Sequence, residues 1–241
     1  MAGHSKFKNI QHRKNAQDKK RAKLFTRVVR EIISAVKTGA PEPEHNPRLR
    51  QAIISARLVN LPRDRIERAI SQAKASGEDF NYTDIRYEGY APGGIAVIVE
   101  ASTDNKNRTA AEVRSIFTKY GGNLGETGSV SFTFDKLGFI EYDKDLFSEE
   151  RLLEIALEID AFDTESKEYY HIIYTKVEDL HEVLDKATKL LNSPPSDTYI
   201  GWRPHNLMEA QSEERLEILQ KMIDLMEDSD DVNRVFTNCI I

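Results

Sequence analysis

Residues 82–99 read YTDIRYEGYAPGGIAVIV. Here the apolar pattern of the chain changes from a helical period to a period of two. Alternation over 82–87 and a β-branched run over 95–99 predict two strands. The intervening Pro92, Gly93 and Gly94 are typical of a turn. We therefore expect β structure to begin here and a domain boundary near residue 78.

The residues before this stretch have helical patterns. Over 15–38, one apolar stripe forms at the spacing of three and four, made of Phe25, Val28, Val29, Ile32, Ile33 and Val36. The opposite side collects cations that we expect to face solvent: Lys20, Lys23, Arg27, Arg30 and Lys37. Asn46 and Pro47 predict the start of a second helix. Pro62 predicts a third. Three helices with short links predict a small bundle.

The residues after 99 alternate between helical and extended patterns. The expected helices are 107–120, 148–159, 176–191 and 212–227. The expected strands are 129–135, 138–142, two candidates around Phe162 and Ile172, an extended stretch over 198–208, and 234–240. This order favours an α+β multidomain fold, in which an N-terminal helical bundle precedes two ferredoxin-like α+β domains.

The last of these domains is expected to be inserted in the middle one. The strand and helix near 95–120 need partners, which the C-terminal helix and strand would supply. The predicted domains are 1–78 (basic and helical), 79–135 plus 206–241 (middle α+β domain) and 136–205 (inserted α+β domain).

Charge is divided unevenly along the 241 residues. Residues 1–77 hold 18 Lys+Arg against 6 Asp+Glu, a net charge of +12, and the remainder holds 16 against 34, a net charge of −18. Such asymmetry indicates a basic segment for polyanions and an acidic remainder that resists non-specific contacts.

Several other classes of protein are not indicated. No apolar run approaches the roughly 20 residues that cross a bilayer, and no apolar segment follows the first charged residues as in a signal peptide. We expect a cytoplasmic protein without membrane contact. The single cysteine, Cys239, favours neither a disulfide nor a zinc site. The histidines His4, His12, His45, His171, His181 and His205 are scattered. We predict no enzyme, metal, cofactor or small-molecule substrate.

The strongest candidate site is a basic segment, residues 1–30, with ten Lys+Arg against a single acid, Asp18. Such a segment attracts phosphates and releases counterions, and Phe7 could stack on a base. The predicted nucleic-acid-binding residues are His4, Lys6, Phe7, Lys8, His12, Arg13, Lys14, Lys19, Lys20, Arg21, Lys23, Arg27 and Arg30. A solubilising tail is the alternative.

Further cations could extend this surface: Arg48, Arg50, Arg57, Arg63, Arg65 and Arg68. Asp64 and Glu67 could instead pair with some of them. Lys106 and Arg108 could reach a phosphate, but capping of a helix explains their segment better. Residues 121–128 are rich in glycine and follow a helix, whereas phosphate loops follow a strand. We interpret them as a flexible turn that binds no nucleotide.

These motifs closely resemble the YebC/PmpR family, which includes the mitochondrial translational activator of cytochrome oxidase subunit one. The resemblance is nearly full-length and is densest in Gly3-His4-Ser5-Lys6-Phe7, His12-Arg13-Lys14, Gln17-Asp18, Asn46-Pro47-Arg48-Leu49-Arg50, Pro62, Ile66-Glu67-Arg68-Ala69-Ile70, Tyr87-Glu88-Gly89-Tyr90, Asp104-Asn105-Lys106-Asn107-Arg108-Thr109 and Gly128-Ser129-Val130-Ser131-Phe132. Phe7 replaces the family's usual tryptophan, and Ala91 a usual glycine.

The resemblance implies a helical domain followed by two α+β domains, and a DNA-binding transcriptional regulator. It equally implies an alternative, a ribosome-associated translation factor that binds ribosomal RNA with the same basic surface. An acidic protein-interaction module and an unrecognised hydrolase are the other rival hypotheses. The oligomeric state is not predicted.

Overall fold

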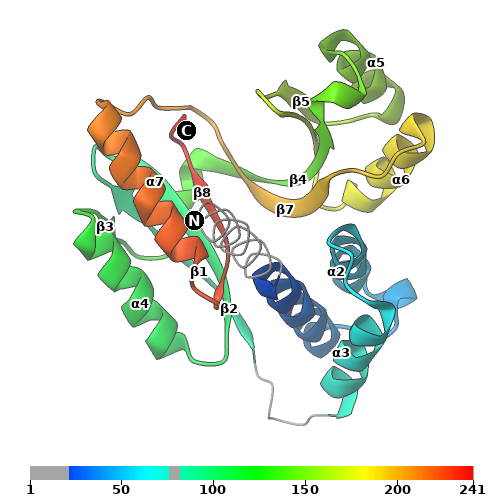
Figure 1. Cartoon of the computed structure of the whole chain (residues 1–241), viewed down its shortest axis with the longest axis horizontal. Coiled ribbons are helices and arrows are strands. Elements are labelled where there is room, and N and C mark those ends of the chain that lie inside the picture. Colours follow the sequence, from blue (N-terminus) through cyan, green and yellow to red (C-terminus); the bar gives the residue numbers. More distant parts are fainter. Residues whose placement is uncertain (1–21, 76–81, 241) are drawn as a thin grey trace, which may run out of the picture.

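The structure, a computed structural model, describes residues 22–75 and 82–240. The predicted domain boundary near residue 78 lies outside these ranges. Three groups of elements can be followed in Figure 1: a set of helices, a sheet with two long helices beside it, and a second sheet with two helices of its own.

The helical group consists of a first helix over residues 22–38, a short helix η1 (Pro43–His45), and helices α2 (Pro47–Leu58) and α3 (Arg63–Ala75). Asn46 caps α2 as expected, because its side chain accepts a hydrogen bond from the Leu49 N–H at 3.0 Å. Its amide also donates to the Ala35 carbonyl at 2.7 Å, which ties the first helix to the second. The predicted stripe supplies the core: Ile32 is fully buried, together with Leu49.

The first sheet has the strand order β3-β1-β2-β8. Its strands are β1 (Thr83–Ala91), β2 (Ile95–Thr103), β3 (Asn123–Leu124) and β8 (Val232–Thr237), beside α4 (Lys106–Lys119) and α7 (Glu213–Glu227). Val97 and Val99 pack with residues of α4 and α7. Ile98, which points to the opposite face, packs with Trp202. Because β2 is buried on both faces, its sequence is a continuous apolar run.

The second sheet has the order β5-β6-β4-β7. Its strands are β4 (Phe134–Asp143), β5 (Asp163–Ser166), β6 (Tyr170–Thr175) and β7 (Asp197–Pro204), with α5 (Glu149–Ile159) and α6 (Leu180–Leu191) between them in sequence. All strand pairs of both sheets are antiparallel. The strands of this sheet all lie between β3 and α7 along the chain.

Most predicted elements are present, and β8 pairs with β2, as the need for a C-terminal partner predicts. The predicted strand over 129–135 is wrong. Residues 131–133 form the short helix η2 (Ser131–Thr133), and β4 begins at Phe134 and includes the predicted strand 138–142. The reason is that the Val130 and Ser131 N–H groups donate to the carboxylate of Glu88, so they are not used in a strand ladder. Helix α6 begins at Leu180, later than predicted.

Aromatic rings leave room only for a glycine at position 201, where the two sheets meet. A Cβ on Gly201 would lie 2.8 Å from the Phe236 ring and 2.9 Å from the rings of Phe139 and Tyr199. We expect Gly201→Ala to lower the free energy of unfolding by about 1–3 kcal/mol, because the rings must shift. Urea unfolding followed by circular dichroism measures this change. In a Phe236→Leu background the same substitution should cost less; an unchanged cost would show that the Phe236 ring is not the cause.

Candidate nucleic-acid interface

Most of the predicted basic segment precedes the described residues. His4, Lys6, Phe7, Lys8, His12, Arg13, Lys14, Lys19, Lys20 and Arg21 lie outside them. The described part of the segment, residues 22–30, lies in the first helix and includes Lys23, Arg27 and Arg30.

These three cations lie against the acidic turn, which we define as residues 227–231, from the last residue of α7 to the residue before β8. Lys23 Nζ pairs with the Asp228 carboxylate and also donates to the Asp228 carbonyl at 2.9 Å. Arg30 Nη1 lies 3.1 Å from the Asp231 carboxylate. Burial, followed by repulsion from Arg234, lowers the pKa of Arg27. The prediction that this side of the helix faces solvent is therefore wrong for these residues, because the C-terminal end of the chain covers it.

Asp231 is the centre of a buried polar cluster, and its side chain is 5% exposed. One carboxylate oxygen accepts hydrogen bonds from Arg108 at 2.6 Å, Thr109 at 2.8 Å and Thr103 at 3.0 Å. Burial acts to raise the pKa of Asp231, but the hydrogen bonds from Arg108, Thr109 and Thr103 outweigh it, so the pKa lies below its ordinary value. Arg30 of the first helix also contacts Asp231. The cluster therefore links the helical group to the first sheet.

The second predicted basic group is divided. Arg48 pairs with Glu31 at 2.7 Å and with Asp84 at 2.6 Å. Burial acts to lower the pKa of Arg48, but these two carboxylates raise it overall. Arg50 donates to the carbonyls of Pro43 and Glu44. Both arginines thus have internal partners.

The remaining arginines of this group are exposed on α2 and α3. The alternative pairings predicted from sequence are present: Arg63 with Glu67 at 2.8 Å and Arg68 with Asp64 at 3.4 Å. Exposed pairs of this kind contribute little stability, so a phosphate could compete for these arginines. Among the residues that the structure describes, Arg57 and Arg65 have no ion-pair partner.

The segment with Lys106 and Arg108 caps helix α4, as predicted. Asn105 accepts from the Arg108 N–H at 3.1 Å. The Arg108 side chain contacts Asp104 and Asp231, whereas the side chain of Lys106 is exposed. Of these two candidates, Lys106 is the more available to an added anion.

The glycine-rich residues 121–128 are more than a flexible turn. They contain β3, which pairs with β1. The buried carboxylate of Glu88 accepts hydrogen bonds from the backbone N–H groups of Gly128, Val130 and Ser131. It also forms an ion pair with Arg86 at 2.7 Å. Burial acts to raise the pKa of Glu88, but the three amides and Arg86 lower it to about 2. These amides are thus occupied by a carboxylate of the protein itself.

Comparison with known proteins covers nearly the whole chain. Residues 5–77 match the TACO1/YebC protein N-terminal domain, and residues 82–239 match the TACO1/YebC second and third domain. The chain belongs to the TACO1/YebC family. The resemblance stated from the sequence is therefore confirmed.

Relatives within the TACO1/YebC family span the same length. A protein of Rickettsia bellii is 58% identical over 238 residues, which cover 99% of this chain and 93% of that protein. A protein of Rickettsia typhi is 52% identical, covering 100% of this chain and 96% of that protein. Both are named as probable transcriptional regulatory proteins. The crystal structure of a conserved hypothetical protein from Aquifex aeolicus matches with a TM-score of 0.85 and 45% identity, over 92% of this chain and 90% of that chain.

No helix in residues 22–75 or 82–240 is long and apolar enough to span a membrane. Within those ranges, no three His, Cys, Asp or Glu side chains gather in a way that could hold a metal ion.

Proposed function

We propose that this member of the TACO1/YebC family is a non-enzymatic regulator of gene expression that binds nucleic acid, acting as a DNA-binding transcriptional regulator in the cytoplasm. The names of the Rickettsia relatives support regulation of transcription. The uneven division of charge supports a polyanionic partner, because local potential governs such association more than net charge does.

One observation carries the proposal: ten of the first 30 residues are Lys or Arg, and one is acidic. Lys23, Arg27 and Arg30 lie against the acidic turn, so we assign phosphate contacts chiefly to the cations before residue 22. Arg57, Arg65 and Lys106 are exposed and would extend that surface. Phosphate contacts supply affinity, and Phe7 would supply stacking on an unpaired base.

The α+β part is proposed to shape the complex or to meet a protein partner. In this proposal, each sheet with its helices forms one ferredoxin-like domain, and the domain of the second sheet is inserted in that of the first. The sequence order supports insertion, since β8 pairs with β2 although the whole second sheet intervenes.

The test is to delete residues 1–14, the N-terminal arm, and to reverse its charges with Lys6→Glu, Lys8→Glu, Arg13→Glu and Lys14→Glu. Either change should weaken binding to duplex DNA at least about tenfold and reduce the slope of log affinity against log salt by ~0.9 for each lost phosphate contact. Fluorescence anisotropy over a salt series measures both quantities. Thermal melting should be little changed, because the arm has almost no periodic apolar pattern.

A matched control reverses four exposed lysines of the acidic part, Lys119, Lys186, Lys189 and Lys221. This control changes the net charge by the same amount as the charge-reversed arm. It should retain most of the affinity for duplex DNA. Unchanged affinity after deletion of the arm would contradict the proposal. Tight binding to ribosomal RNA, weak binding to duplex DNA and salt-sensitive sedimentation with ribosomes would favour the translation-factor alternative.

A further inference from the structure

Helix α5 carries two exposed leucines that do not pack in the core of the protein. Leu152, Ile155 and Ile159 are buried in the core of the second sheet. Leu153 and Leu157, one turn apart on the outer face, are 56% and 85% exposed. They form an apolar stripe on the surface, where an ordinary amphipathic helix has polar residues.

Acidic residues border this stripe. Glu150, Glu154 and Glu158 follow one another at intervals of one turn beside the leucines, and all three are exposed. Glu154 pairs with Arg151 of the same helix at 2.7 Å, so Glu150 and Glu158 are the more available acids. This arrangement repels nucleic acid and anionic membranes. It is complementary to a protein surface with an apolar hollow and a cationic rim.

The chain itself has such a hollow between α2 and α3. It has a volume of about 340 Å³, with apolar walls formed by Ile53, Leu61, Ile66 and Ile70. Its rim carries Arg57 and Arg63 and one acid, Glu67, which pairs with Arg63. Arg57 is exposed and makes no ion pair among the described residues.

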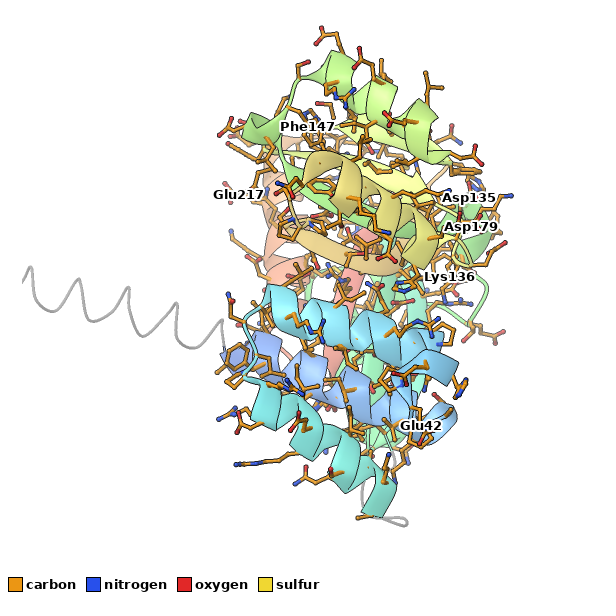
Figure 2. All side chains as sticks on the ribbon, turned by 90° about the vertical axis from the view of Figure 1, so that its right-hand side faces the viewer. Glu42, Asp135, Lys136, Phe147, Asp179 and Glu217 are labelled. Atoms are coloured by element: carbon orange, nitrogen blue, oxygen red, sulfur yellow. The ribbon has the colours of Figure 1, made fainter. Side chains whose placement is uncertain are left out.

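The stripe and the hollow lie on different groups of elements, the stripe on the second sheet's helix α5 and the hollow in the helical group. Helix α5 is at the top and α3 at the bottom in both Figure 1 and Figure 2. Contact between them therefore requires two molecules. We propose that the Leu153–Leu157 stripe of one copy docks in the α2–α3 hollow of a second copy.

This contact joins two different surfaces, so each bound copy still offers one free stripe and one free hollow. Association of this kind continues into rings or open chains and does not stop at a dimer. A single helix in a groove buries little surface, so the contact is weak and depends on protein concentration. The inference does not rest on the proposed function, because association occurs without nucleic acid. Arg57 belongs to both proposed surfaces, so we expect bound nucleic acid to compete with self-association.

Sedimentation velocity of the full chain, over a range of concentrations and without nucleic acid, tests this proposal. The average mass should rise with concentration past that of a dimer. Leu153→Gln with Leu157→Gln should weaken association at least ~10-fold. Both side chains are largely exposed, so circular dichroism should show an unchanged fold. Leu225→Gln, which changes an exposed leucine of α7, is the matched control and should associate as the wild type does.

An exchange of charges distinguishes a second copy from any other occupant. Glu158→Arg and Arg57→Glu should each weaken self-association, and an equimolar mixture of the two variants should restore part of it, since the reversed charges face each other in mixed contacts. A wild type that stays monomeric would overturn the proposal. So would association that survives the leucine substitutions, or a mixture that associates no better than either variant alone.

Discussion

Replacing Glu88 with glutamine is expected to lower the free energy of unfolding by about 3 kcal/mol at neutral pH. The pKa of Glu88 is about 2 in the folded protein, against an ordinary value of 4.5. Each unit of pKa difference corresponds to ~1.4 kcal/mol of stability once the carboxyl group is ionised in both states. Glutamine is neutral, so the ion pair with Arg86 is lost. Its side-chain NH2 group is a donor and cannot accept hydrogen bonds from the three backbone N–H groups.

The sign of the pH dependence follows from the lowered pKa. The contribution of Glu88 is fully present above the unfolded pKa, and it is lost as pH falls through about 4.5 toward about 2. The difference between wild type and Glu88→Gln should therefore shrink to less than half by about pH 3. Urea unfolding at a series of pH values measures it. Glu126→Gln, an exposed acid in the same loop, is the control; a difference independent of pH would contradict the assigned role.

Replacing Asp231 with alanine is expected to cost about 3–5 kcal/mol, because Arg30 and Arg108 would lose a buried partner. Thr103 and Thr109 would lose their acceptor as well. The folded pKa of Asp231 is lowered, so its contribution is present above the unfolded pKa and is lost as pH falls through the folded value. Chemical unfolding at neutral pH measures the loss.

Asp230→Ala is the matched control for that variant. Asp230 is the neighbouring residue and is exposed, and its backbone carbonyl, which accepts from Arg30, remains after the substitution. It should change stability by less than ~0.5 kcal/mol. Equal losses of stability in the two variants would show that the hydrogen bonds and ion pairs of Asp231 contribute nothing beyond the removal of one negative charge from this turn.

The sequence predicts most elements because their signals are local. The cap at Asn46, the stripe around Ile32 and the turn at Gly93 each depend on neighbouring residues, and the structure has a helix or turn at each. The wrong predictions concern partners distant in sequence. Arg30 has the pattern of a solvent-facing cation, but it meets Asp231 about 200 residues later. Ser131 has the pattern of a strand residue, but its N–H donates to Glu88.

The candidate site was predictable only in part for the same reason. The excess of Lys and Arg before residue 31 is visible in the sequence, and the phosphate contacts inferred from it stay a prediction. Asp231 belongs to an acidic run that resembles an ordinary solvated surface in sequence. Only the fold distinguishes it from Asp230, by placing its carboxylate beside Arg108 and Thr109.

The pairing of β2 with β8 determines when this protein can finish folding during synthesis. Val97 pairs with Thr237, about 140 residues later in the chain. Ribosomes add about 5–20 residues per second, so β2 waits on the order of ten seconds for its partner. Throughout that time its apolar edge is open to other strands. The acidic turn that meets Lys23 and Arg30 is translated about 200 residues after them, so a nascent chain carries its basic helix uncovered until that turn has emerged.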